Sequence, residues 1–449
     1  MSEETKQNAR SIALKILSKV TREGSYSNLA VKDVLKGAEL GEADKRLASQ
    51  IAYGVLENLM YIDHALSAYL REKPDDTLMN ILRIGTYQLL FLSKIPESAA
   101  VNESVLLCAR TGRESKRGFV NAVLRKVSKD KNDILLPDKE TQPEKYLSIK
   151  YSYPLWLVSK WISEYGYEFA EKMVSYRPRQ RGICLVPNPM KISTADWEAY
   201  LKNKGLQFEK GEWSPECFYV KGYGDLAADE MFLSGKVSSI GEAAALVARI
   251  TSPQKGTMVI DACAAPGGKS MLMAQLTGGE AEIIAFDIHP HRVQLVEKNA
   301  KRLGYYRITA QLQDAAELKK GLAGRAGAVL VDAPCSGLGV TDSKPDIKLT
   351  KSPEAIAELA KLQMQILQTC SKYVAPGGTL VYSTCTIIKE ENEEIIKAFL
   401  ANNPKFEMAD LSAYVPEGFD RARLSNGWLQ LFPHLDHIDG FFIAKMTRR

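Results

Sequence analysis

The sequence of 449 residues lacks several features that would assign it to a class at once. No apolar run approaches the roughly 18 residues that a membrane-spanning helix needs. The polar start Met1-Ser2-Glu3-Glu4 does not show the charged-then-apolar order of a signal peptide. Only five histidines and seven scattered cysteines are present, without a CxxC pair, which argues against a zinc site and a disulfide framework. We therefore expect a soluble cytoplasmic protein with reduced thiols, no metal and no membrane partner.

The net charge and the chain length constrain the type of partner and the number of domains less strongly. A net charge of +5 permits a nucleic-acid partner, but many proteins with such a mild excess bind none. The 45% content of hydrophobic residues is ordinary for chains with buried cores. At about 150 residues for each domain, the length predicts roughly three domains.

Residues 1–128 have apolar side chains at helical spacing, which predicts an all-α bundle. A polar stretch with Pro137 and Pro143 follows and has the composition of a linker. Residues 145–238 mix a helical entry with short strand candidates and predict a small α+β domain. Within it, Arg177, Arg179 and Arg181 alternate beside Tyr176 and could bind RNA phosphates while the ring stacks on a base. A solvated basic loop is the alternative.

From residue 239 to 449, apolar strands alternate with helices, which predicts a Rossmann-like, doubly wound and mostly parallel sheet. In such sheets ligands bind at the carboxyl ends of the strands. Two late apolar segments, 428–432 and 441–446, predict a hairpin at the sheet edge. The expected parallel strands are 258–261, 283–287, 308–311, 328–332 and 379–383.

The first of these strands runs into a loop of small residues followed by a helix. Small residues let a ligand approach the backbone, and the amides at a helix N-terminus offer hydrogen-bond donors. A Walker loop would need glycine where Cys263 stands, and the GxGxxG fingerprint of dinucleotide sites is absent from the sequence. The loop residues are Cys263, Ala264, Ala265, Pro266, Gly267, Gly268 and Lys269.

Acidic residues follow the next two strands. Asp287 stands near the interval of about 20 residues at which an acidic side chain grips ribose hydroxyls in this fold. Asp314, after the third strand, could add a polar contact to the base. Either residue could instead cap a helix. S-adenosylmethionine fits this pattern better than a nicotinamide cofactor, because it needs adenosine contacts but no pyrophosphate cradle.

Two cysteines follow the last two expected parallel strands. Cys335 comes after Asp332-Ala333-Pro334, and Cys385 comes after Ser383-Thr384. A thiolate that adds to carbon 6 of a cytosine makes carbon 5 nucleophilic enough to take a methyl group. Cys385 could attack, Cys335 could assist release, and Asp332 could hold a ring nitrogen. The alternative is a small buried hydrophobe, which we expect for Cys108 and Cys370.

Short fragments in the first 128 residues resemble the NusB antitermination-factor domain, which implies an RNA-binding helical module. The fragments are Asp44-Lys45-Arg46, Gly54-Val55-Leu56, residues 82–90, Pro96, Val101-Asn102-Glu103 and residues 119–124.

From about Tyr151 to its end, the chain resembles the RsmB/Sun family of RNA cytosine carbon 5 methyltransferases. The matching segments are 240–246, 261–270, Asp314, 332–337, 344–347, 382–386 and 439–444. One departure is Asp342-Ser343-Lys344, where the family is often arginine-rich.

The resemblance implies that the loop from Cys263 to Lys269 binds S-adenosylmethionine together with Asp287, Asp314 and Asp332. It also implies that Cys385 is the nucleophile and that Cys335 aids product release. The implied substrate is a cytosine of small-subunit (16S) ribosomal RNA, unassembled or partly assembled, and flipped out of its stack. We expect a monomer.

Two other interpretations stay open. The chain could methylate transfer RNA or DNA; DNA enzymes of this chemistry use the cysteine of the Pro-Cys pair as nucleophile. It could also be an RNA-binding assembly or antitermination factor.

Overall fold

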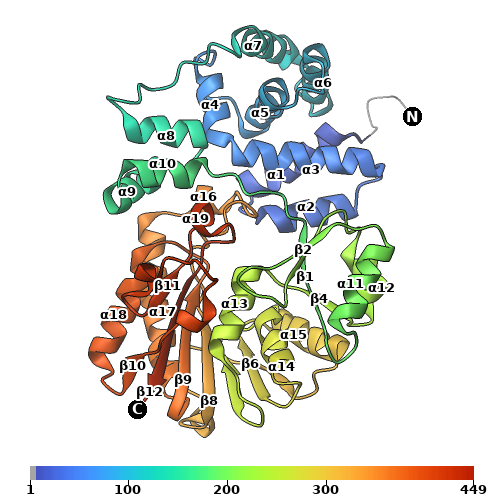
Figure 1. Ribbon diagram of the computed structural model, residues 1–449. Coiled ribbons are helices and arrows are strands. Elements are labelled where there is room, and N and C mark those ends of the chain that lie inside the picture. Colours follow the sequence, from blue (N-terminus) through green and yellow to red (C-terminus); the bar gives the residue numbers. More distant parts are fainter. Residues whose placement is uncertain (1–6) are drawn as a thin grey trace. The chain divides into compact units, whose positions relative to one another are not determined.

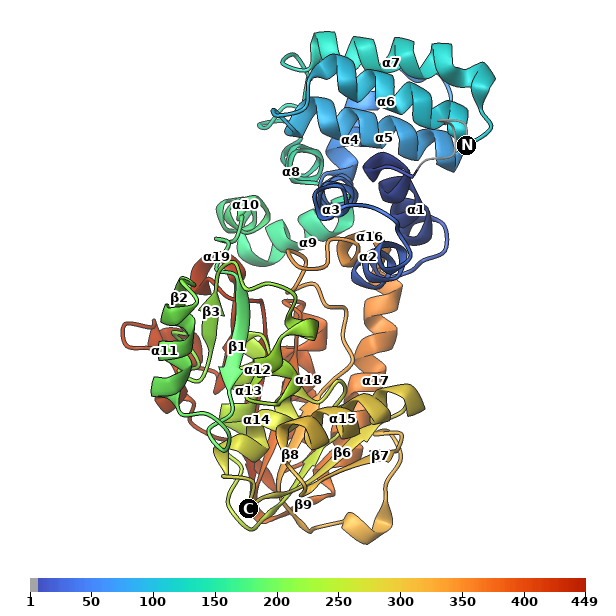
Figure 2. The same cartoon turned by 90° about the vertical axis from the view of Figure 1, so that its right-hand side faces the viewer.

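The computed structural model describes residues 7–449, so the polar start Met1–Glu4 lies outside the described residues. The chain forms two compact units (Figures 1 and 2). The first contains the residues up to Tyr176 together with Thr341–Lys351, and the second contains Arg177–Val340 and Ser352–Arg449. In the described part of the chain, every helix is too short or too polar to cross a membrane.

The first unit is all-α, as the helical periodicity predicts, and its first seven helices, α1–α7, share one large apolar core. Cys108 is fully buried in this core, as expected. The helices are α1 (Ala9–Thr21), α2 (Ser27–Lys36), α3 (Glu42–Glu57), α4 (Leu59–Ser67), α5 (Asp76–Phe91), α6 (Glu97–Arg110), α7 (Arg117–Asp130), α8 (Pro143–Tyr151), α9 (Leu155–Tyr165), α10 (Tyr167–Ser175) and α16 (Ile347–Thr350).

Two glycines let helices of this unit pack closely against one another. A Cβ atom on Gly54 of α3 would lie 2.0 Å from the Tyr87 ring of α5. A Cβ on Gly85 of α5 would lie 2.5 Å from the Leu124 side chain of α7. Because interiors are close-packed, any larger residue at either position would force the helices apart. The fragments around residues 54, 85 and 120 are therefore parts of one packing arrangement.

Helices α8–α10 belong to this first unit, whereas the sequence analysis groups residues 145–176 with the small α+β domain. The physical reason lies in their contacts with the bundle. Ser152 ends α8 in a left-handed conformation, and its Oγ accepts a hydrogen bond from the backbone N–H of Tyr61 in α4, at 3.1 Å.

Residues 341–351 form a segment that leaves the second unit after Val340 and returns to it at Ser352. Within the first unit, the buried Asp346 carboxylate accepts a hydrogen bond from Ser27 Oγ. The ammonium group of Lys348 donates to the Glu57 carbonyl at 3.1 Å and lies over the Tyr153 ring, 4.2 Å from its centroid. The segment containing Lys344-Pro345-Asp346-Ile347 therefore completes the helical unit.

The second unit contains a small antiparallel sheet with strand order β2-β3-β1-β4, which bears out the α+β character expected for this region. Its apolar core contains Trp197, Leu201 and Phe218. The elements are β1 (Ile183–Pro187), α11 (Thr194–Asn203), β2 (Phe208–Lys210), β3 (Phe218–Val220), α12 (Glu230–Leu233) and β4 (Val237–Ser239).

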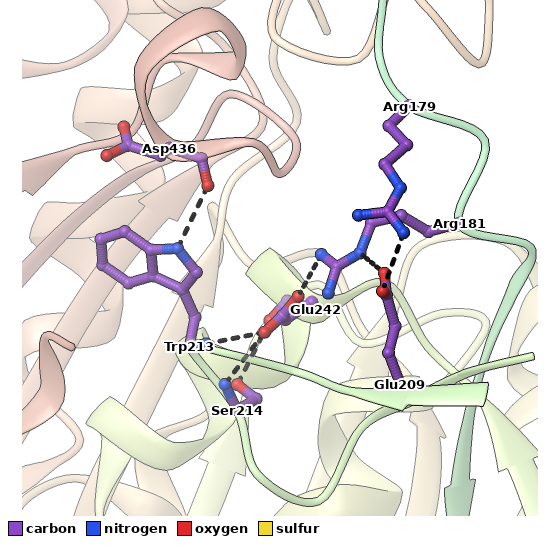
Figure 3. Close-up of polar contacts among 7 residues, drawn as sticks. All are labelled: Arg179, Arg181, Glu209, Trp213, Ser214, Glu242 and Asp436. Atoms are coloured by element: carbon purple, nitrogen blue, oxygen red, sulfur yellow. Dashed lines mark hydrogen bonds and ion pairs between the residues drawn. The ribbon is translucent and has the colours of Figure 1, made fainter.

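The Arg181 side chain, just before β1, makes its contacts with other residues of the protein (Figure 3). Its side chain is only 18% exposed, forms ion pairs with Glu209 at 2.5 Å and Glu242 at 3.2 Å, and stacks on Tyr219. Arg179 is 72% exposed and lies 3.5 Å from Glu209. Arg181 therefore points inward and makes structural contacts. Arg177 and Arg179 remain the candidates for RNA contact.

Glu242 is the centre of the contacts in Figure 3. Its fully buried carboxylate also accepts hydrogen bonds from the backbone N–H groups of Trp213, at 2.7 Å, and Ser214, at 3.3 Å. The Trp213 indole N–H donates to the Asp436 carbonyl at 3.3 Å. One buried acid therefore ties the Arg181 segment to the loop that precedes β3.

The larger sheet confirms the predicted Rossmann-like topology. Five parallel strands follow the order β9-β8-β5-β6-β7, so the order reverses between β5 and β8. The strands are β5 (Met258–Asp261), β6 (Glu282–Asp287), β7 (Ile308–Leu312), β8 (Ala326–Asp332), β9 (Val374–Thr384), β10 (Phe406–Met408), β11 (Trp428–Gln430) and β12 (Phe442–Arg448).

Helices cover both faces of this sheet (Figures 1 and 2). Those on one face, α17 (Pro353–Ser371) and α18 (Glu393–Asn402), share an apolar core with the strands, and Cys370 is fully buried there, as expected. On the other face lie α13 (Glu242–Thr251), α14 (Gly268–Leu276) and α15 (Pro290–Leu303).

The C-terminal strands extend one edge of the sheet, as the two late apolar segments predict. Strand β12 pairs antiparallel with β9 and with β11, and β10 adds a short outer strand that the sequence analysis missed. Before β12, Gly440 passes so close to Gly339 that a Cβ on Gly339 would lie 2.0 Å from the Gly440 carbonyl oxygen. The Gly339 N–H donates to the Cys385 carbonyl at 3.0 Å, and the Gly440 N–H donates to the Gly339 carbonyl at 2.8 Å. This approach requires glycine at both positions and joins three loops at one edge.

Candidate active site

The predicted site residues follow the carboxyl ends of the parallel strands, which meet at one edge of the sheet. Asp261 ends β5, Asp287 ends β6, Asp332 ends β8, and Cys385 directly follows β9. The register pairs Asp332 with Ser383, so the segments that carry Cys335 and Cys385 begin side by side. The reversal of strand order between β5 and β8 opens a crevice for ligands in folds of this type.

The segment from Cys263 to Lys269 leads from the end of β5 into the first turn of α14. Gly267 has a φ of +101°, a conformation that side chains other than glycine rarely adopt, and α14 begins at the next residue. The Ala264 N–H donates to the Phe286 carbonyl at 2.8 Å, which anchors the loop to β6. The Cys263 side chain packs against the apolar core, and burial raises the pKa of its thiol well above the ordinary value.

Lys269 and Asp332 form the main ion pair of the site. The Lys269 ammonium lies 2.6 Å from Asp332 Oδ2, and Ser383 Oγ donates to Oδ1 at 2.8 Å. Burial lowers the pKa of Lys269, but the charges of Asp332, Asp261 and Cys385 outweigh it and raise the pKa above the usual value. Lys269 therefore stays protonated, and its charge faces both Asp332 and Cys385.

Asp261 is a site residue that the sequence analysis did not single out. It is 1% exposed, and its Oδ2 accepts from Ser270 Oγ at 2.6 Å. Burial raises the pKa of Asp261 to about 6, although the Ser270 hydrogen bond lowers it. Among residues 7–449, no donor makes a hydrogen bond of normal geometry to Oδ1 of Asp261, although the Cys263 backbone N–H is near enough to the carboxylate to lower its pKa. A buried carboxylate oxygen without a donor fits a ligand that brings its own N–H groups.

Asp287, at the end of β6, and Asp314, after β7, each accept a hydrogen bond from a nearby backbone N–H. Asp287 is 6% exposed, and its Oδ1 accepts from the His289 N–H at 2.9 Å. Asp314 is half-buried, and its Oδ1 accepts from the Ala316 N–H at 2.8 Å. Each contact reaches a backbone N–H two residues further on, so it closes a local turn and is not the helix cap considered as the alternative. A carboxylate offers about four acceptor positions, so these contacts leave room for a ribose or base contact.

Cys335 and Cys385 are brought together. Their Sγ atoms lie 3.2 Å apart, and both side chains are half-buried. The contact with Cys385 and burial raise the pKa of the Cys335 thiol well above its ordinary value. The raised pKa favours the thiol form of Cys335, which can share a hydrogen bond with Cys385.

The comparisons with known proteins agree with this architecture. A family model described as "16S rRNA methyltransferase RsmB/F" matches residues 248–447, a NusB family model matches residues 7–129, and a ferredoxin-like domain model of RsmF/B-like methyltransferases matches residues 153–227. "Probable ribosomal RNA small subunit methyltransferase B" of Bacillus subtilis is 37% identical over 448 residues, with 99% of each chain covered. The chain belongs to the ribosomal RNA small subunit methyltransferase B family.

Another member of this family, from Shewanella oneidensis, is 31% identical over 98% of this chain and 99% of its own length. Among solved structures, the crystal structure of PH0851 has a TM-score of 0.82 and 25% identity, and it covers 98% of this chain and 99% of that one. The structure of NSun6 from Pyrococcus horikoshii with SFG has a TM-score of 0.57 at 23% identity, covers 66% of this chain and 98% of that chain, and shares the fold.

The family assignment settles the class of reaction and its methyl donor. Members of the family are RNA methyltransferases that use S-adenosylmethionine. The residues of this site fit that molecule, since Asp261 offers a buried acceptor for its ammonium group and the strand-end acids offer acceptors for its hydroxyls. The sequence motifs thus led to the correct family and cofactor.

Proposed function

We propose that this protein methylates carbon 5 of a cytosine in 16S ribosomal RNA through a covalent adduct with Cys385. The observation that carries the proposal is the 3.2 Å contact between the Cys335 and Cys385 sulfur atoms, beside the ion pair of Lys269 and Asp332. A methyltransferase that acts on an oxygen or an exocyclic nitrogen has no use for two adjacent thiols. Carbon 5 of cytosine does need covalent activation, because it is too poor a nucleophile on its own.

Cys385 is the proposed nucleophile. As its thiolate adds to carbon 6, the sulfur–carbon bond forms and the double bond between carbons 5 and 6 opens, which makes carbon 5 nucleophilic. The protonated Lys269 stabilises the thiolate, since an opposite charge nearby favours the charged form. The Cys335 sulfur lies 3.2 Å from Cys385 and can share a hydrogen bond with it.

Asp332 is proposed to bind the cytosine ring. Lys269 and Ser383 hold its carboxylate, which keeps an acceptor position for the N–H of ring nitrogen N3; this nitrogen takes a proton from solvent as the thiolate adds and returns it when the product is released. A proton on that nitrogen draws electron density from carbon 6 and favours attack by the thiolate. The ion pair with Lys269 thus holds Asp332 in place as an acceptor.

Cys335 is proposed to assist release. After methyl transfer, the proton on carbon 5 must leave and the bond between carbon 6 and Cys385 must break. Cys335 can give its proton to the departing Cys385 sulfur and take the proton from carbon 5, so the product regains its double bond and both cysteines end as thiols. The 3.2 Å separation allows a direct transfer between the sulfurs.

The cofactor-binding residues are proposed from the same edge of the sheet. Bound S-adenosylmethionine supplies an electrophilic methyl group. The backbone of residues 263–269 would line its methionine part, with the Asp261 carboxylate accepting from the ammonium group. Asp287 and Asp314 would accept from the ribose and the base.

The substrate would be a cytosine in unassembled or partly assembled small-subunit RNA, flipped out of its stack so that carbon 6 can reach Cys385. The NusB-like unit would bind this RNA. A ribosomal RNA substrate implies a cytoplasmic location, and we propose a monomer.

The test is transfer of labelled methyl groups to deproteinised 16S RNA and, in parallel, to transfer RNA, followed by nucleoside analysis. We expect label in 5-methylcytosine from the 16S RNA. Label only in transfer RNA would reject the substrate, label in another nucleoside would reject the chemistry, and no label in either RNA would favour an assembly factor.

A further inference from the structure

A buried polar cluster lies behind the two cysteines, and the chemistry proposed above does not use it. It includes an acid, two amides and two hydroxyls, all at most 1% exposed. Its members are Ser336, Gln363, Thr386, Glu391 and Asn392. Burying polar groups is costly unless they are hydrogen-bonded. The segments around this cluster therefore have to supply hydrogen-bond partners for it.

Glu391, at the end of the turn η5 (Lys389–Glu391), holds the Cys335 loop from both sides. Its Oε2 accepts from the Ser336 N–H at 2.8 Å and from Gln363 Nε2 at 2.9 Å. The same Gln363 nitrogen donates to the Pro334 carbonyl at 2.9 Å. The residues immediately before and after Cys335 are therefore fixed by one carboxylate and one amide.

The same turn also holds the Cys385 loop. The Glu391 carbonyl accepts from the Tyr382 hydroxyl at 2.6 Å. Asn392 accepts from Thr384 Oγ1 at 2.5 Å and donates to the Thr386 carbonyl at 3.0 Å. Finally, the Ser336 and Thr386 hydroxyls lie 2.8 Å apart and join the two loops directly.

The charge of Glu391 acts on one cysteine in particular. The groups that raise the pKa of Cys335 are Cys385 first, then burial, and then the negative charges of Glu391 on η5 and Asp332 on β8. A glutamine would accept the Ser336 hydrogen bond equally well. A carboxylate at this position additionally opposes loss of the proton from Cys335.

We propose that Glu391 is a positioning residue that fixes Cys335 against Cys385. Its negative charge also favours the thiol form of Cys335. This inference rests on the proposed function, in which Cys385 attacks and Cys335 releases the product. Glu391 does not touch the substrate in this scheme. It acts through Ser336, Gln363 and its own charge.

The first test measures the proton affinity of Cys335 without reference to catalysis. The pH dependence of iodoacetamide labelling at Cys335 is compared in Cys385→Ser and in Cys385→Ser/Glu391→Gln, which removes one charge and preserves shape. We expect the labelling midpoint to fall by about one pH unit when Glu391 is replaced. The control is Cys385→Ser/Glu394→Gln, because Glu394 is an exposed acid three residues further on. An unchanged midpoint in the Glu391 variant, or an equal fall in the control, would overturn the proposal.

The second test uses the reaction. In Glu391→Ala, we expect covalent protein–RNA adduct to accumulate as in Cys335→Ala, with kcat reduced at least tenfold and KM for S-adenosylmethionine within twofold of wild type. Glu391→Gln, which can still hold Ser336, should accumulate less adduct. A loss of S-adenosylmethionine binding in both variants, or wild-type turnover in Glu391→Ala, would contradict a positioning role. If instead Cys385→Ala stays active, the proposed function fails, and the labelling midpoint still decides what Glu391 does to Cys335.

Discussion

The Lys269 ammonium and the Asp332 carboxylate form a 2.6 Å ion pair between the first turn of α14 and the end of β8. The pair joins the cofactor loop to the strand that leads to Cys335, and Ser383 extends it to the strand that leads to Cys385. Side chains from the start of α14 and from the ends of β8 and β9 are thereby held in one cluster. In the proposed reaction the cluster serves two purposes, since it stabilises a thiolate and presents an acceptor to the cytosine ring.

Replacing Lys269 with Met should weaken the nucleophile. Without the ammonium, the Cys385 thiolate loses its nearby positive charge, so we expect the acid limb of the pH–rate profile to move up by about one unit. At pH values below that limb, the rate should fall about tenfold. Lys269→Arg retains the charge and should keep the wild-type limb. A profile in Lys269→Met that is lower at every pH but unshifted would argue against this electrostatic role.

Asp261 should make the stability of the protein depend on pH. Its pKa is about 6 in the folded protein against 3.8 without the fold, so between these values the folded state binds more protons than the unfolded state. The stabilisation is fully present below pH 3.8 and is lost as the pH rises through about 6. Relative to Asp261→Asn, the wild type should therefore lose about 3 kcal/mol across this window. Urea unfolding of both proteins at several pH values measures the difference, and parallel curves would refute it.

Arg181 should be important for stability. Arg181→Ala leaves the buried Glu242 carboxylate without its cationic partner, for which we expect a loss of about 3–5 kcal/mol. Arg179→Ala is the matched control, since Arg179 is 72% exposed and should cost at most about 1 kcal/mol. Hydrogen exchange of the amides in β1 and β3 reports the change. Equal protection in the two variants would show that the Arg181 ion pairs are not structural.

Asp346 should hold the 341–351 segment on the helical unit. Asp346→Ala leaves the buried Ser27 hydroxyl without its acceptor and should weaken the docking by about 1–3 kcal/mol. We expect faster proteolysis within residues 341–351, measured by mass spectrometry of the fragments. Asp44→Ala, which removes an exposed acid from the same unit, serves as the control and should cleave like the wild type. Identical cleavage in Asp346→Ala would mean that other contacts hold the segment.

Local patterns were sufficient to predict the sheet and the residues at its edge. The parallel strands alternate with helices at regular intervals, so Asp287, Asp332, Cys335 and Cys385 could be assigned to strand ends without a structure. Parallel strands bring all these ends to one edge, which is why residues far apart in the sequence could be combined into one site.

The residues that were missed depend on partners distant in the sequence. Gln363 and Glu391 form hydrogen bonds with backbone groups of the Cys335 loop. The helical spacing of apolar residues in the sequence does not indicate such contacts. Arg181 was named as a possible RNA contact, but Glu242 on a separate helix pairs with it inside the protein. The docking of residues 341–351 rests on one four-residue helix, which is too short to produce a periodic signal.

The most direct test of the account compares wild type, Cys385→Ala and Cys335→Ala for methyl transfer to 16S RNA and for protein–RNA adduct on denaturing gels. We expect 5-methylcytosine with wild type, neither product nor adduct with Cys385→Ala, and accumulated adduct with Cys335→Ala. Methyl transfer by Cys385→Ala, or loss of adduct in Cys335→Ala with adduct retained in Cys385→Ala, would contradict the assignment of Cys385 as the nucleophile.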